Sequence, residues 1–168
     1  MAVYSRHGEV MSGNPNSMSI LDLITAESMV VPLAATDKQQ AIDNLMDHLG
    51  TTSNLKDIEE LKHLVWTREN QRSTGIGNGL AIPHGKCDSI SKLVLVIGVL
   101  EEPIEFDSVD GKPVKMIALL LSPCDQIAEH IQALGKISRL MNDEGFRNSA
   151  YGCQSPEQLF ELIKATSE

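Results

Sequence analysis

The sequence predicts a single α/β domain in which a mixed β-sheet carries helices on both faces. Two stretches are almost wholly aliphatic, 93–100 (LVLVIGVL) and 114–121 (VKMIALLL), as expected of strands buried on both faces. Segments with the helical spacing of apolar residues lie before and after these stretches. The length of 168 residues is typical of one domain.

The N-terminal part of the chain begins with a polar segment and a strand. Residues 1–17 are polar and rich in turn-forming residues, so we expect a flexible tail ahead of a domain that spans 18–168. Ser19 precedes a short helical turn. The stretch 29–33 (MVVPL) is typical of a strand, and Pro32, which has no amide hydrogen for a neighbour, indicates either a sheet edge or the end of the strand.

Two amphipathic helices follow this strand. Thr36 or Asp37 caps the first helix, and Gly50 is expected to end it. The second helix spans about 56–69, where apolar residues recur every three or four positions.

The C-terminal half contains the two aliphatic strands and two further helices. Residues 109–112 are typical of a turn between the strands. Asp125 is expected to cap a helix that runs to Met141. Its predicted buried stripe consists of Ile127, Ile131, Leu134 and Met141. The motif 155–158 (SPEQ) combines a capping box with proline at the first helical position, and so predicts the start of a last helix.

The composition excludes several classes of protein. The net charge is −9, from 14 basic and 23 acidic side chains, which disfavours nucleic acid and anionic membrane as partners. The three cysteines form no CxxC pair, so we expect neither a disulfide framework nor a zinc site. No apolar run is long enough for a membrane span, and the N-terminal residues do not resemble a signal peptide. A cytoplasmic location is the simplest expectation.

The segment 72–86 (RSTGIGNGLAIPHGK) places one histidine on a stiff turn. Pro83 fixes its own backbone and restricts the preceding residue, and His84 follows directly. Gly85 is expected to let another protein approach closely.

Charge and hydroxyl donors for an anion are available close by in sequence, from Arg68, Arg72, Ser73 and Thr74. A phosphohistidine needs a neutral imidazole beside such donors. The pattern alone leaves His84 as either that site or an ordinary turn histidine.

His130 falls inside the predicted buried stripe of its helix. A polar ring there needs a hydrogen-bond partner or an opening to solvent. The residue is therefore either a satisfied core histidine, which is the commoner case, or a second imidazole beside His84. No role is assigned to the remaining histidines, His7, His48 and His63.

Two nucleotide-binding motifs can be rejected. The glycines of 75–79 (GIGNG) follow a predicted helix instead of a strand, so they do not form a dinucleotide-binding turn. The segment that ends at Lys86 is not a phosphate-binding P-loop, because Cys87 stands where that motif has serine or threonine.

The segment 72–86 resembles the active-site segment of the mannitol/fructose-type IIA domains of the bacterial phosphotransferase system (PTS). The wording TGIGNGLAIPHGK is most similar to the nitrogen-regulatory IIA branch, and the resemblance extends over about 19–162. It implies that His84 is phosphorylated on Nε2 and that His130 is a second active-site histidine. It also implies an active-site arginine at Arg68 and a phosphate-binding pair at Ser73 and Thr74.

The resemblance further implies a transferase component without metal or organic cofactor. The phosphoryl donor would be a phosphohistidine carrier, either HPr or its nitrogen-branch relative. In one hypothesis the phosphorylation state of the chain regulates partner proteins. In the alternative the chain is the IIA component of a sugar-uptake system and passes the phosphoryl group to a IIB domain. The kinds of genes next to the gene for this chain would distinguish these two hypotheses.

Overall fold

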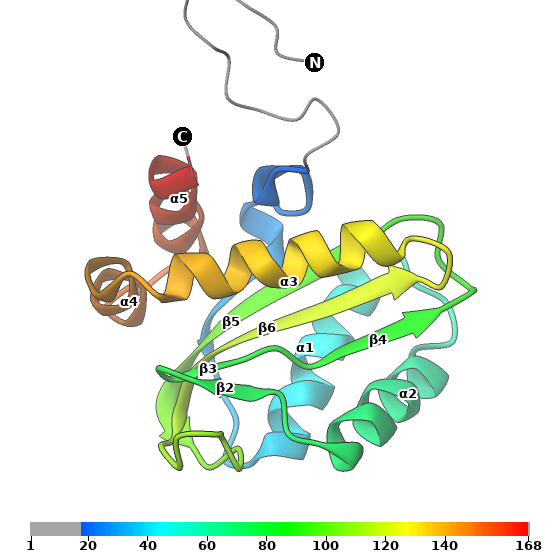
Figure 1. Cartoon of the computed structure of the whole chain (residues 1–168), viewed down its shortest axis with the longest axis horizontal. Helices are drawn as coiled ribbons and strands as arrows, with labels where there is room; N and C mark the ends of the chain where they lie inside the picture. The colour runs from blue at the N-terminus through cyan, green and yellow to red at the C-terminus, as the bar shows by residue number, and fades with distance from the viewer. Residues whose placement is uncertain (1–17, 168) are drawn as a thin grey trace, which may run out of the picture.

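A mixed sheet of six strands runs through the computed structural model, which describes residues 18–167 (Figure 1). The strands are β1 (Met29–Leu33), β2 (Gly75–Gly77), β3 (Leu80–Ala81), β4 (His84–Cys87), β5 (Val94–Ile104) and β6 (Val114–Pro123). Their order is β1-β5-β6-β3-β2, and β4 pairs with β6 further along than β3. Strands β5 and β6 are antiparallel, whereas β1 is parallel to β5 and both β3 and β4 are parallel to β6. The predicted mixed sheet is confirmed.

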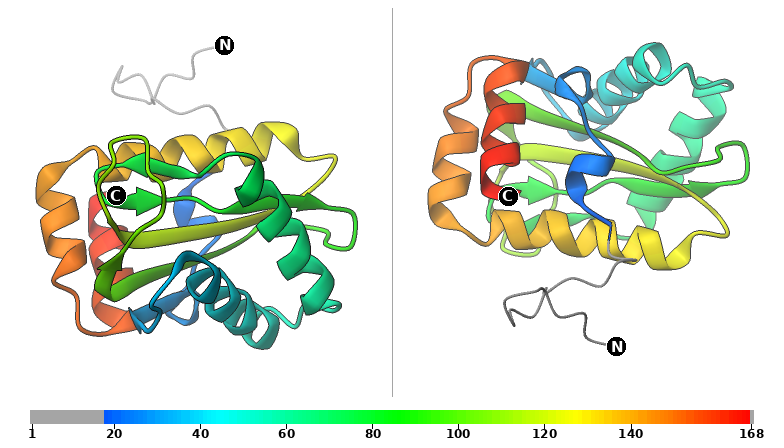
Figure 2. Two further views of the ribbon diagram at one scale, coloured as in Figure 1. Left: turned by 90° about the horizontal axis from the view of Figure 1, so that it is seen from below. Right: turned by 90° about the horizontal axis from the view of Figure 1, so that it is seen from above.

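Helices cover both faces of this sheet, as predicted. The α-helices are α1 (Lys38–Thr52), α2 (Ile58–Gln71), α3 (Ile127–Met141), α4 (Glu144–Tyr151) and α5 (Pro156–Ser167), and two 3-10 helices precede β1, η1 (Ile20–Asp22) and η2 (Ala26–Ser28). Figure 2 shows α1 and α3 on opposite sides of the sheet. Helices α1 and α2 share one aliphatic cluster with one face of the sheet, and α3, α4 and α5 share a second cluster with the other face.

The aliphatic strands form the centre of the molecule because they are buried on both sides. Alternate residues of β5 pack into the two clusters, with Leu95 and Ile97 facing α3 to α5 and Val96 facing α1 and α2. Strand β1 is an edge strand, and the side chain of Pro32 in it is exposed, as the sequence predicts. The predicted flexible tail, residues 1–17, lies outside the described residues. None of the helices within 18–167 combines the length and the apolar character that a bilayer crossing requires.

Two predicted helix boundaries are wrong. Helix α1 continues past Gly50 to Thr52. A Cβ atom on Gly50 would lie 2.7 Å from Cγ1 of Ile58, so the glycine allows close contact with the first residue of α2. Helix α3 begins after Gln126, which caps it without a side-chain hydrogen bond, and Asp125 does not cap it.

The buried face of α3 differs from the predicted stripe. The side chains of Ile127 and Ile131 are 55% and 63% exposed. The residues that face the sheet are His130, Ala133, Ile137 and Met141. Both sets have helical spacing, and the sheet packs against the second. His130 is therefore more deeply buried than its isoleucine neighbours.

Candidate functional site

The site lies where the chain passes from β3 to β4 along the edge of β6. Strand β3 ends at Ala81, and pairing with β6 resumes at His84, which is opposite Leu120. Between them, the carbonyl of Pro83 accepts a hydrogen bond from the amide of Leu120 at 3.0 Å. Leu120 faces the cluster under α3, so its partner His84 presents its side chain on the same face of the sheet.

The His84 ring is held in one tautomer by the backbone. Its Nδ1 atom lies 2.8 Å from the carbonyl oxygen of Ile82. A carbonyl oxygen can only accept, so Nδ1 carries the hydrogen and Nε2 carries the lone pair of the neutral ring. Burial lowers the pKa of His84, and the cations of Arg68 and Lys86 act in the same direction, although the bond to Ile82 and the Glu69 carboxylate oppose them. The half-buried ring is therefore neutral at pH 7.

His130 lies directly against His84. The ring centroids are 5.2 Å apart, and the ring planes are inclined by 64°. His130 is 4% exposed, and its Nδ1 atom lies 2.6 Å from Oγ of Ser122 on β6. Burial, together with the smaller effects of the neighbouring His84 and Lys86, lowers the pKa of His130 to about 4. The pair predicted from the sequence is thus two adjacent neutral imidazoles.

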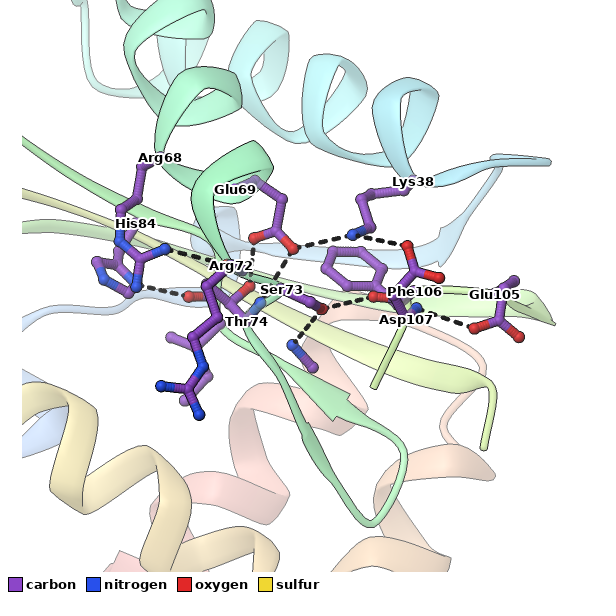
Figure 3. Close-up of polar contacts among 12 residues, drawn as sticks. Lys38, Arg68, Glu69, Arg72, Ser73, Thr74, His84, Glu105, Phe106 and Asp107 are labelled. Atoms are coloured by element: carbon purple, nitrogen blue, oxygen red, sulfur yellow. Dashed lines mark hydrogen bonds and ion pairs between the residues drawn. The ribbon is translucent and has the colours of Figure 1, made fainter. Parts of the chain in front are cut away.

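Arg68 reaches the same place from the last turn of α2. The ribbon of α2 lies on the opposite side of the sheet from α3, and Figure 3 shows the Arg68 side chain extending toward His84. Its Nη1 atom donates to the carbonyl of Arg72 at 3.0 Å, which holds the guanidinium at the end of the helix. Its charge is close enough to lower the pKa of His84. Three groups therefore meet at this place: the Arg68 cation, the Nε2 lone pair of His84 and the His130 ring.

Ser73 and Thr74 lie beside this group, but their hydroxyls are engaged within the protein (Figure 3). Ser73 Oγ donates to the carbonyl of Phe106 at 2.6 Å and accepts from the amide of Gly75 at 3.1 Å. Thr74 Oγ1 donates to Oε2 of Glu69 at 2.6 Å. Direct contact between these two hydroxyls and a phosphate stays a prediction.

Glu69 is a buried carboxylate that the sequence reasoning missed. Its Oε1 atom accepts from the amide of Thr74 at 3.0 Å and from Lys38 Nζ at 3.1 Å. The same lysine ammonium lies 4.7 Å from the centre of the Phe106 ring (Figure 3). A signal was present, because Glu69 continues the buried series Leu61 and Val65 at a spacing of four residues.

A chain of hydrogen bonds connects Glu69 to the His84 ring. Thr74 donates both its amide and its hydroxyl to Glu69. The carbonyl of Thr74 accepts from the amide of Ile82 at 3.1 Å, and the carbonyl of Ile82 accepts from Nδ1 of His84. The buried carboxylate thereby fixes the segment that orients the histidine.

Gly85 differs in role from what the sequence suggests, and Lys86, to which the sequence assigns no role, lies near both histidines. Gly85 does not face a partner protein, because a Cβ atom there would clash with Cδ2 of Leu64 on α2. The glycine is needed for the packing of α2 on β4. Lys86 is exposed and follows His84 by two positions on β4, so it lies on the same face of the strand. Its charge lowers the pKa of both histidines.

The glycine loop turns two of its backbone amides toward the protein. The amide of Gly75 donates to Ser73, and the amide of Asn78 donates to Asp110 at 3.1 Å. Gly77 and Gly79 have φ values of 100° and 77°, which are accessible to glycine without strain.

Within residues 18–167, no group of three histidine, cysteine or acidic side chains is arranged to hold a metal ion.

Comparisons with known proteins agree on one family. Residues 22–166 match the family model described as "Phosphoenolpyruvate-dependent sugar phosphotransferase system, EIIA 2". A "Nitrogen regulatory protein" of Bradyrhizobium diazoefficiens is 30% identical over 146 residues, which cover 87% of this chain and 95% of the relative.

A second relative is named as a fructose-specific component, and a similar crystal structure is named as a nitrogen regulatory protein. The "PTS system fructose-specific EIIABC component" of Bacillus subtilis is 27% identical over 87% of this chain, but the match spans 23% of that longer protein. The crystal structure of nitrogen regulatory protein IIA-Ntr from Neisseria meningitidis superposes with a TM-score of 0.78 at 27% identity, covering 84% of this chain and 97% of that one.

Proposed function

The chain belongs to the EIIA 2 family of the phosphoenolpyruvate-dependent sugar phosphotransferase system, and from this premise we propose that it is a phosphocarrier that accepts a phosphoryl group on Nε2 of His84. Members of this family are phosphoryl-transfer components. The observation that carries the proposal is the bond from His84 Nδ1 to the Ile82 carbonyl, since it leaves the Nε2 lone pair available.

The transfer requires no proton movement at His84. The Nε2 lone pair forms a bond to phosphorus, while the bond from phosphorus to the donor protein's histidine nitrogen breaks and returns its electron pair to that nitrogen. Nδ1 keeps its hydrogen and its bond to Ile82 throughout. The lowered pKa of His84 supports this role, because a protonated ring would have no lone pair to attack with.

His130 and Arg68 are the proposed partners of the transferred group. Its three oxygens carry negative charge, and preorganised donors and a cation stabilise that charge. His130 adjoins the His84 ring, and Arg68 brings a permanent charge to it. The hydroxyls of Ser73 and Thr74 make hydrogen bonds within the protein, which supports a role in positioning the segment before His84. The resemblance implies, in addition, that the two residues contact the phosphate.

The phosphoryl donor is proposed to be a phosphohistidine carrier of the HPr type or its nitrogen-branch relative. Ile127 and Ile131 lie one turn apart on α3, on either side of His130 in sequence, and both are exposed. They give a partner protein an apolar contact beside the site. Transfer from a donor of this class would take place in the cytoplasm.

The outcome of phosphorylation is proposed to be regulatory. The match to a nitrogen regulatory protein covers nearly the whole of both chains, which favours this outcome. Phosphorylation adds negative charge to the surface of a protein whose net charge is already −9, so acidic and basic partners would respond in opposite directions. The alternative is a IIA step in sugar uptake, which the match to the fructose-specific component favours.

Incubation with phosphoenolpyruvate, the general phosphotransferase enzyme and each candidate carrier tests the proposed acceptor. One acid-labile phosphoryl group is expected per chain, and none on a folded His84→Ala variant. His63→Ala is the matched control, because His63 is an exposed histidine on α2. Labelling of His84→Ala to the wild-type level would overturn the assignment.

The phosphorylated protein then discriminates the two outcomes. It is mixed with purified IIB domains of fructose and mannitol type, and the phosphoryl group is followed with time. Retention of the group over many minutes favours regulation. Transfer to a IIB domain within seconds favours the sugar-uptake alternative.

A further inference from the structure

Ser122 is a buried hydroxyl within a largely aliphatic strand. It follows Leu120 by two positions on β6, so its side chain points to the same face of the sheet as that of His84. Helix α3 crosses this face and brings His130 above it, and Ser122 Oγ lies 2.6 Å from Nδ1 of His130. The hydroxyl is fully buried.

The direction of this hydrogen bond follows from what each atom can donate. A serine hydroxyl has one hydrogen, and His130 Nδ1 is the partner that the structure gives it within residues 18–167. If Nδ1 carried the ring hydrogen, the buried hydroxyl hydrogen would have no acceptor there, which is unfavourable. If the hydroxyl donates to Nδ1, the serine is satisfied and the ring hydrogen of neutral His130 lies on Nε2.

We propose that Ser122 is a positioning residue that holds His130 as the Nε2–H tautomer, the opposite of the tautomer that Ile82 imposes on His84. The two facing rings then differ in function. His84 presents a lone pair to the phosphorus atom, and His130 presents an N–H donor to a phosphoryl oxygen. This inference rests on the proposed phosphocarrier function.

Loss of the hydroxyl has a specific consequence. Without it, the His130 ring can also adopt the tautomer with a lone pair on Nε2, which repels a phosphoryl oxygen. Part of the population then has no donor at the second histidine. We expect Ser122→Ala to slow phosphoryl transfer about twofold to fivefold, in proportion to the population that loses the donor.

Nitrogen-15 NMR of the full chain with labelled histidine tests the inference without any transfer reaction. At pH 7.5 the wild-type His84 ring is expected as Nδ1–H and the His130 ring as Nε2–H. In Ser122→Ala the nitrogen-15 chemical shifts of the two His130 ring nitrogens are expected to become more similar to each other. The chemical shifts of the His84 ring nitrogens are expected to stay unchanged. Ser122→Thr, which keeps a hydroxyl, restores both the tautomer and the rate. Ser138→Ala on α3 is the control, because its hydroxyl bonds to the Leu134 carbonyl.

An Nδ1–H form of His130 in the wild type would overturn the inference, and so would a Ser122→Ala spectrum identical to the wild type. The wild-type spectrum decides even if the alanine variant does not fold. Efficient labelling of His84 together with an Nδ1–H form of His130 would refute the role of Ser122 and leave the proposed function standing. Opposite tautomers without any labelling would refute the proposed function instead.

Discussion

The imidazole rings of His84 and His130 meet edge to face, although they belong to a short edge strand and to the helix that follows β6. Two cationic rings at this separation would repel each other. The structure avoids this because the pKa values of both rings are lowered, chiefly by burial. The neutral pair therefore depends on how α3 packs over β4 and β6.

Replacement of His130 by alanine is expected to slow phosphoryl transfer about 100-fold to 1,000-fold, as loss of one donor to developing charge does elsewhere. His130→Gln restores a donor near the Nε2 position and is expected to recover part of the rate. Rapid-quench measurement with a phosphorylated carrier gives these rates. Transfer at the wild-type rate in folded His130→Ala would return this residue to a purely structural role.

His130 also makes the stability of the protein depend on pH. In the unfolded chain it takes up a proton near pH 6.5, but in the folded protein it resists protonation until about pH 4. The unfolded state therefore binds more protons between these values, so stability is lost as the pH falls through this window. The loss that is due to His130 is at most about 3 kcal/mol.

Urea unfolding of the wild type and of His130→Gln at several pH values between 7.5 and about 4.5 isolates this contribution. The wild type is expected to lose more stability than the variant as the pH falls. His84 acts in the same direction but is present in both proteins, so it cancels in the difference. Parallel stability curves would contradict the expected depression of the His130 pKa.

Arg68→Gln is expected to slow transfer about 10-fold to 100-fold while changing the free energy of unfolding by less than about 1 kcal/mol. The guanidinium makes one hydrogen bond to the Arg72 carbonyl at the helix end, so little packing is lost. The substitution should also raise the pKa of His84, because Arg68 lowers it. NMR titration of the ring measures that shift. Arg72→Gln is the matched control, and an unchanged His84 pKa together with an unchanged rate would exclude Arg68 from the site.

Glu69→Ala is expected to destabilise the fold by about 3 kcal/mol, because it leaves the Thr74 donors without their acceptor and leaves the Lys38 ammonium with the exposed Asp107 carboxylate at 3.6 Å. A double-mutant cycle with Lys38→Met measures the coupling. The double variant should lose clearly less stability than the sum of the two single losses. Strict additivity would show that the ion pair between Glu69 and Lys38 does not contribute to stability.

The sequence predicts the sheet and most helices because these signals are local. The aliphatic runs of β5 and β6 and the Asp37 cap of α1 all appear in the structure. Helix α4 was not predicted, because it buries few apolar residues beyond Phe146 and Ala150. Strands β2 and β4 were also missed, since they are short and exist through pairing with distant segments.

The site is less accessible to sequence reasoning because it is assembled from distant elements. His84 and Arg68 lie near each other in sequence, but the side chains approach from opposite faces of the sheet. For His130, periodicity identifies the helix without choosing between two apolar stripes. Ser122 was missed, although a single hydroxyl residue directly after the aliphatic run 114–121 is a usable signal. Such a group must find a partner when it is buried.

The regiochemistry of the phosphorylated ring tests the central claim most directly. Phosphorus-31 and long-range nitrogen-15 NMR of the phosphorylated protein identify which ring nitrogen bears the phosphoryl group. We predict that phosphorus is bonded to Nε2 of His84 while Nδ1 keeps its hydrogen. A phosphoryl group on Nδ1 of His84, or on His130, would contradict the claim that the Ile82 carbonyl selects the accepting nitrogen.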